Sequence, residues 1–117
     1  MPDWLTVTDG PPPPGATVVD GRACVTRPGL FDEWAWVLQF PTWFGRNCDA
    51  FADCLRTVTD AAPLTVEVTD ADRLLADEPP DALATFLRVL ADLATEAGRL
   101  RVVVHTETEL PEDWAAS

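Results

Sequence analysis

Two aspartates with helical spacing are the residues of this sequence best placed to do chemistry at a surface. Asp49 and Asp53 stand four positions apart in residues 48–59, a segment whose apolar residues recur at helical spacing. Residues four apart share one face of a helix, and this face is opposite the apolar stripe. We therefore expect both carboxylates to be exposed, where they can accept charge-assisted hydrogen bonds from a basic partner.

The same pair also has a purely structural interpretation and a catalytic one. Acids in the first turn of a helix are favoured by its dipole, by ~0.3–1 kcal/mol. That accounts for Asp49 better than for Asp53, which lies a full turn further along. A glycosidase pair needs a cleft and an apolar pocket that raises the pKa of one carboxyl group, and this short chain indicates neither.

Other catalytic or metal-binding chemistry has little support in the sequence. The single histidine, His105, and a cysteine form a dyad in principle, but Cys54 lies on an apolar stripe and fits a core position. There is no CxxC motif, histidine pair or glycine-rich phosphate loop. Asp70 and Asp72 begin like a calcium loop, but Leu75 occupies the position of the required glycine. We predict a protein without enzymatic activity, cofactor or metal.

The charge balance indicates the kind of partner. The chain has 117 residues and 20 acidic against 8 basic ones, a net charge of -12. Such a surface repels nucleic acid and anionic membranes and attracts a basic protein. No apolar run approaches the ~20 residues of a membrane span, and the first residues lack a secretory pattern. We expect a cytoplasmic protein that is monomeric when free.

The chain divides into three regions by composition. Residues 1–16 are predicted to be an N-terminal arm, with the prolines at 11–14 as a stiff spacer. Its residues 4–8 suit either an edge strand or a loose segment, and we favour the loose segment. Residues 17–106 are predicted to form the domain, and 107–117 an acidic tail.

Within the domain, the apolar patterns predict strands alternating with helices. Strands are expected at residues 17–19, 64–68 and 99–104, and helices at 30–39, 48–59, 70–76 and 81–97. Strands separated by helices imply a parallel sheet, so the predicted fold is α/β with a three-stranded parallel sheet and about four helices. The near-continuous apolar run of the last strand suggests burial on both faces. The expected core residues are Phe51, Cys54, Leu55, Leu87, Leu90 and Val103.

Residues 40–55, FPTWFGRNCDAFADCL, resemble the barstar family. Its members carry a proline, two aromatics, Gly-x-Asn, x-Asp-Ala and an ending similar to Asp-Cys-Leu. The resemblance extends from about Val18 to Val104 and includes the Asp-Gly turn after the first strand and the glycine that closes the long helix. The first sixteen residues and the acidic tail lie outside it.

This resemblance implies a non-catalytic, intracellular inhibitor of a secreted ribonuclease. In the family, the second helix and the loop before it plug the nuclease active site. Asp53 matches the carboxylate that occupies the substrate-phosphate position, and an acid of the long helix, Asp92 or Glu96, lies near a further contact position. Arg56 departs from the family pattern by replacing a small polar residue, and its spacing allows it to pair with Asp53. The expected partner-binding residues are Trp43, Asn47, Asp49, Asp53, Arg56 and Thr57.

Several functions are compatible with these features. The leading hypothesis is an inhibitor, or immunity protein, that blocks a basic ribonuclease or a related nuclease toxin. The alternative is an acidic regulatory module for a basic partner that is not a nuclease. Two further functions are considered. A protein that mimics nucleic acid should carry acids spread over several elements, not focused on one helix. A small hydrolase would be detected by a direct activity screen.

Overall fold

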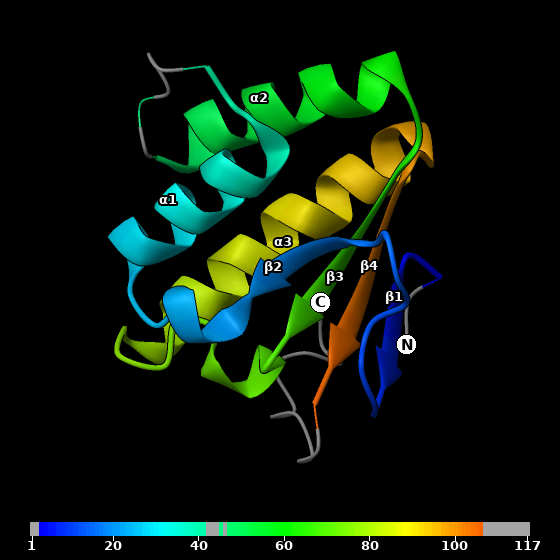
Figure 1. Ribbon diagram of the computed structural model, residues 1–117. Helices are drawn as coiled ribbons and strands as arrows, with labels where there is room; N and C mark the ends of the chain where they lie inside the picture. Colours follow the sequence, from blue (N-terminus) through cyan, green and yellow to red (C-terminus); the bar gives the residue numbers. More distant parts are fainter. Residues whose placement is uncertain (1–2, 42–44, 46, 107–117) are drawn as a thin grey trace.

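The computed structural model describes residues 3–41, 45 and 47–106 (Figure 1). Its elements, in chain order, are β1 (Leu5–Thr8), β2 (Thr17–Asp20), the 3₁₀ helix η1 (Gly21–Ala23), α1 (Arg27–Leu38), α2 (Cys48–Ala61), β3 (Leu64–Thr69), the 3₁₀ helix η2 (Ala71–Arg73), α3 (Pro80–Ala97) and β4 (Leu100–His105).

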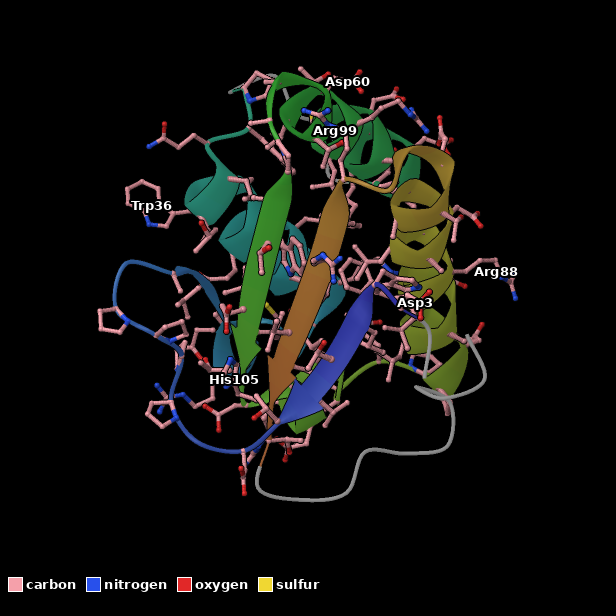
Figure 2. All side chains as sticks on the ribbon, turned by 90° about the vertical axis from the view of Figure 1, so that its right-hand side faces the viewer. Asp3, Trp36, Asp60, Arg88, Arg99 and His105 are labelled. Atoms are coloured by element: carbon pink, nitrogen blue, oxygen red, sulfur yellow. The ribbon has the colours of Figure 1, made fainter. Side chains whose placement is uncertain are left out.

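The strands form one parallel sheet in the order β1-β4-β3-β2. Helices α1 and α2 connect β2 to β3, and α3 connects β3 to β4. The three α-helices gather on one side of the sheet, and Figure 2 views the strands from the other side. The predicted α/β class and parallel sheet are confirmed. The numbers of elements differ: the described residues form four strands where three were expected, and three α-helices where about four were expected.

The additional strand is β1, so the loose arm expected at residues 4–8 is wrong. Leu5 lies opposite Val102 of β4, and the backbone N–H of Val102 donates to the carbonyl of Trp4 at 2.8 Å. The side chains of Trp4 and Leu5 are both buried. Two effects favour a strand here. The two apolar side chains become buried, and β1 pairs with backbone groups of β4 that would otherwise have no partner. The two strands come together although they lie almost a whole chain length apart in the sequence.

The core lies between the sheet and the helices. Phe51 of α2 is at its centre, with its ring 5.4–5.9 Å from four other aromatic rings, those of Phe31, Trp34, Phe40 and Phe86. Five of the six predicted core residues are buried: Phe51, Cys54, Leu55, Leu87 and Leu90.

Val103 is the exception among the predicted core residues. It is half-buried, and Arg101, on the same face of β4, is exposed. These side chains point away from the helices, because successive residues of a strand alternate between the two faces of the sheet. The expectation that β4 is buried on both faces is therefore wrong. The run of valines in the sequence gave no sign that one face of this strand is partly exposed.

The helix expected at residues 70–76 is also wrong, because only the short η2 forms there. Asp70 and Leu75 both adopt left-handed backbone conformations, with φ of 48° and 55°. The N–H of Leu75 donates to the carbonyl of Cys24 at 2.7 Å, and that of Asp77 to Val25 at 2.9 Å. These bonds to a distant segment take the donors that a continuous helix needs.

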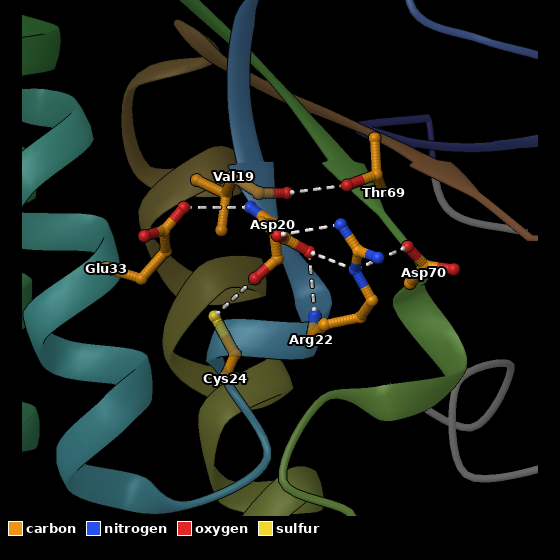
Figure 3. Close-up of polar contacts among 7 residues, drawn as sticks. All are labelled: Val19, Asp20, Arg22, Cys24, Glu33, Thr69 and Asp70. Carbon is orange, nitrogen blue, oxygen red and sulfur yellow. Dashed lines mark hydrogen bonds and ion pairs between the residues drawn. The ribbon is translucent and has the colours of Figure 1, made fainter.

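The predicted Asp-Gly turn after β2 brings three elements together (Figure 3). A Cβ on Gly21 would lie 2.2 Å from the carbonyl oxygen of Asp70, so only glycine permits this approach of η1 to the end of β3. The N–H of Asp20 donates to Glu33 of α1 at 3.0 Å, and Arg22 lies 3.3 Å from Asp20. Partial burial alone would raise the pKa of Asp20, but hydrogen bonds and charge from Arg22 outweigh it and hold that pKa below its usual value.

Candidate functional site: the outer face of α2

The beginning of α2 is fixed by Asn47. Its side-chain oxygen accepts a hydrogen bond from the N–H of Ala50 at 2.8 Å, as expected of an N-cap. Its amide nitrogen donates to the carbonyl of Gly45 at 3.2 Å. Asn47 therefore fixes the start of the helix and also contacts the backbone of Gly45.

This start determines which residues of α2 face solvent. Phe51, Cys54 and Leu55 face the core, whereas Asp49 and Asp53 are exposed, as the spacing predicted. The side chain of Asp53 is 79% exposed. The outer face of α2 thus presents carboxylates to solvent on a helix whose other side is anchored in the aromatic core.

Arg56 and Thr57 lie next to Asp53. Arg56 Nη1 donates to Asp53 Oδ1 at 3.0 Å, so the pairing expected from their spacing is confirmed. The hydroxyl of Thr57 donates to the backbone carbonyl of Asp53 at 3.1 Å. Arg56 also contacts Glu96 of α3, with Nε 3.4 Å from Oε1 and Nη2 3.4 Å from Oε2.

A hollow of about 360 Å³ adjoins Asp53 between α2 and the end of α1. Phe40 and Pro41 line one wall, and Asp53, Cys54, Thr57 and Val58 line another. Burial raises the pKa of the Cys54 thiol, with a smaller contribution from the neighbouring charge of Asp53, which keeps this thiol protonated and unreactive. The site therefore combines an exposed carboxylate with a partly apolar recess.

Structure and sequence reasoning differ in what they reveal of this site. Trp43 lies outside the described residues, so its predicted role is not tested. The sequence left open whether Asp92 or Glu96 is the acid of the long helix near a partner contact, and that prediction is not tested. The structure adds that Glu96 contacts Arg56. Trp36 of α1 was missed: its side chain is 82% exposed and stands away from the ribbon in Figure 2. Its position off the apolar stripe of α1 was the available signal.

His105, the histidine considered for a catalytic dyad, contacts Gly10 and Glu67 instead of a cysteine. His105 Nδ1 lies 2.9 Å from the carbonyl oxygen of Gly10, and Nε2 lies 2.6 Å from Glu67 Oε1. A carbonyl only accepts, so Nδ1 carries a hydrogen and donates it to Gly10. Both ring nitrogens are thus engaged, and neither contacts a cysteine; the three cysteines are free thiols.

Neither a metal site nor a membrane span is found in the part of the chain that the structure describes. No group of three or more histidine, cysteine, aspartate or glutamate side chains is arranged to hold a metal ion there. Within the same residues, none of the helices has the length and apolar character needed to cross a membrane.

Comparison with known proteins identifies the class to which this fold and site belong. Residues 16–109 match the model of the family described as Barstar (barnase inhibitor). The match covers most of the 117 residues, and the chain belongs to this family. Members of the family are inhibitors rather than enzymes. No curated protein matches the chain.

Proposed function

We propose that this protein inhibits a barnase-type ribonuclease by placing the outer face of α2, and the loop before it, over the nuclease active site. The observation that carries the proposal is the exposed carboxylate of Asp53, on a helix capped by Asn47, in a chain of the Barstar family. The chain then acts by binding alone and needs no catalytic group of its own.

The chemistry of the proposed contact follows from the substrate of a ribonuclease. Such an active site binds the phosphate of RNA with cationic side chains. The carboxylate of Asp53 accepts the same charge-assisted hydrogen bonds but offers no bond to cleave. The net charge of -12 adds long-range attraction to a basic enzyme.

The other proposed contacts surround Asp53. Asp49 extends the acidic face by one helical turn, and Thr57 lies at the rim of the hollow. Asn47 supports the face by fixing the start of α2. The full set of proposed partner-binding residues is Trp43, Asn47, Asp49, Asp53, Arg56 and Thr57.

The cellular role that fits this function is protection of the producing cell. A secreted ribonuclease endangers the cell that makes it, and an inhibitor kept in the cytoplasm neutralises molecules that fold before export. We propose this immunity role, with the inhibitor monomeric until it meets the enzyme.

The test is titration of the chain into barnase, with RNA cleavage and calorimetry as readouts. We expect Asp53→Ala to weaken binding by at least ~2 kcal/mol, because the cationic groups of the enzyme are left buried and unpaired. Asp53→Asn should restore only part of the loss, because it restores shape without charge. Stability should change by less than ~1 kcal/mol, as expected for an exposed site.

Asp60→Ala is the matched control, because Asp60 is an exposed aspartate near the other end of α2 and should matter little (Figure 2). The placement of the interface is wrong if Asp53→Ala binds like the wild type while Asp60→Ala does not. If the wild type leaves RNA cleavage by barnase unchanged at equimolar and excess concentrations, the proposal fails. The acidic regulatory module for another basic protein then becomes the better hypothesis.

A further inference from the structure

Arg56 joins the outer face of α2 to the long helix α3. Its Nη1 donates to Asp53, while Nε and Nη2 face the two carboxylate oxygens of Glu96, each at 3.4 Å. The Nε atom is buried and makes no hydrogen bond, so it meets Glu96 as an ion pair, whereas Nη2 donates a hydrogen bond to Oε2. Glu96 thus holds one edge of the guanidinium group, and Asp53 receives only the remaining nitrogen.

The charges of these three residues determine what a partner meets. Arginine stays protonated at any physiological pH. Asp53 and Arg56 alone would therefore sum to zero, and a cationic active site would find no net charge at the centre of the interface. Glu96 brings the cluster to one net negative charge.

The geometry has a second consequence for Asp53. Among the described residues, Oδ1 of Asp53 accepts from Arg56, and Oδ2 receives no hydrogen bond. Without Glu96, the Nε and Nη2 edge of Arg56 is released. That edge is the one that binds both oxygens of a carboxylate at once, so the released guanidinium competes for the oxygens that the nuclease would use.

We propose that Glu96 is a positioning residue of the nuclease-binding site, and that it acts through Arg56. By holding the guanidinium edge, it keeps Asp53 available to a cationic group of the partner and offsets the positive charge of Arg56. This inference rests on the proposed function and selects Glu96 as the acid of α3 that supports the interface.

Asp92 offers a matched comparison on the same helix. It is exposed and lies four residues before Glu96, so both acids occupy one side of α3. In the described part of the chain, the Asp92 carboxylate makes no hydrogen bond or ion pair with Arg56. Removal of its charge therefore changes the net charge of α3 equally, without releasing the guanidinium.

The experiment is a double-mutant cycle on the full chain, with affinity for barnase measured by calorimetry. Glu96→Gln should weaken binding by ~10-fold or more, since a released cation then faces the cations of the enzyme. In the Arg56→Gln background the same change should alter affinity by less than ~2-fold, because no guanidinium is left to position. Arg56→Gln alone supplies the reference for this cycle, and Asp92→Asn should stay within ~3-fold of the wild type.

Each outcome decides between the two proposals. An equal loss from Glu96→Gln with and without Arg56 means that Glu96 contacts the partner directly, and the positioning role is wrong. Equal effects of Glu96→Gln and Asp92→Asn also overturn it, since net charge then suffices. Asp53→Ala in the same experiment distinguishes a failure of this inference from a failure of the proposed function. If Asp53→Ala weakens binding while the cycle shows no coupling between Glu96 and Arg56, only this inference fails. If the wild type does not bind, both proposals fail. Thermal melts of every variant identify any loss caused by unfolding.

Discussion

Two carboxylates of this chain, Asp53 and Glu67, have opposite surroundings. Asp53 lies on the outer face of α2 with 79% of its side chain exposed, in reach of Arg56 and of any partner. Glu67 lies on β3 with 10% of its side chain exposed, and it pairs with His105 on the neighbouring strand. His105 in turn contacts the carbonyl of Gly10, in the segment that leads from β1 to β2.

The difference concerns what each charge contributes. An exposed ion pair contributes little to folding, because water and salt screen it, so Asp53 can be selected for its effect on a partner. A buried pair is desolvated, and loss of one member leaves a charge without compensation. The Glu67–His105 pair therefore belongs to the fold and helps to hold the β1–β2 connection, whereas the acids of α2 belong to the surface.

The largest effect should come from the buried pair. His105→Ala removes the partner of Glu67 and should lower the free energy of unfolding by ~3–5 kcal/mol. Urea unfolding measures this loss, and the folded fraction should bind barnase with unchanged affinity. Replacement of both residues by leucine should be milder, since no unpaired charge remains. If His105→Ala lowers the free energy of unfolding by less than ~1 kcal/mol, the Glu67–His105 pair does not support the fold, and the proposed difference between the two carboxylates is wrong.

An apolar residue calibrates this effect. Leu87 of α3 is fully buried in the core. Leu87→Ala should cost ~2–5 kcal/mol through lost burial and the cavity that remains. Denaturant unfolding that shows a loss below about half a kcal/mol would contradict the placement of this side chain.

The net charge of -12 should act mainly on the rate of association. We expect the association rate with barnase to fall at least ~10-fold between ~0.05 M and ~0.5 M salt, because screening shortens the range of the attraction. Stopped-flow fluorescence measures this rate, and the dissociation rate serves as the internal control. A constant association rate over this range would exclude electrostatic steering.

The smallest effect concerns Asp20, a partly exposed carboxylate between the two extremes. Its pKa is lowered in the folded chain, so its charge stabilises the fold above the pKa of the unfolded chain, and this contribution is lost as the pH falls through the folded value, below 3.8. Asp20→Asn should cost well under ~1 kcal/mol at pH 7, and the difference should vanish in acid. Unfolding curves of both proteins from pH 7 to pH 3 test this; a difference that grows in acid would contradict the sign.

Local patterns predicted the elements that position the site. The stripe of α2 and Gly98, the glycine that ends α3, are readable within a few residues, and both are confirmed. The misses depend on distant contacts. Strand β1 requires β4, and residues 70–76 lose their helix because the N–H groups of Leu75 and Asp77 donate to the carbonyls of Cys24 and Val25. The contact of Glu96 with Arg56 likewise depends on how two helices pack, and local patterns do not give it.

Strand β1 also covers an edge of the sheet that could otherwise pair with other molecules. Without β1, strand β4 would be an outer strand, and its segment Leu100–His105 carries three consecutive valines with unpaired backbone donors and acceptors along one side. Such an edge is a template for pairing between molecules and for aggregation. Strand β1, with only four residues and a polar Thr6 exposed, covers that edge and is itself a poorer template. Because Leu5 pairs with Val102, this protection depends on a contact between segments far apart in the sequence, and it can form only once β4 is available.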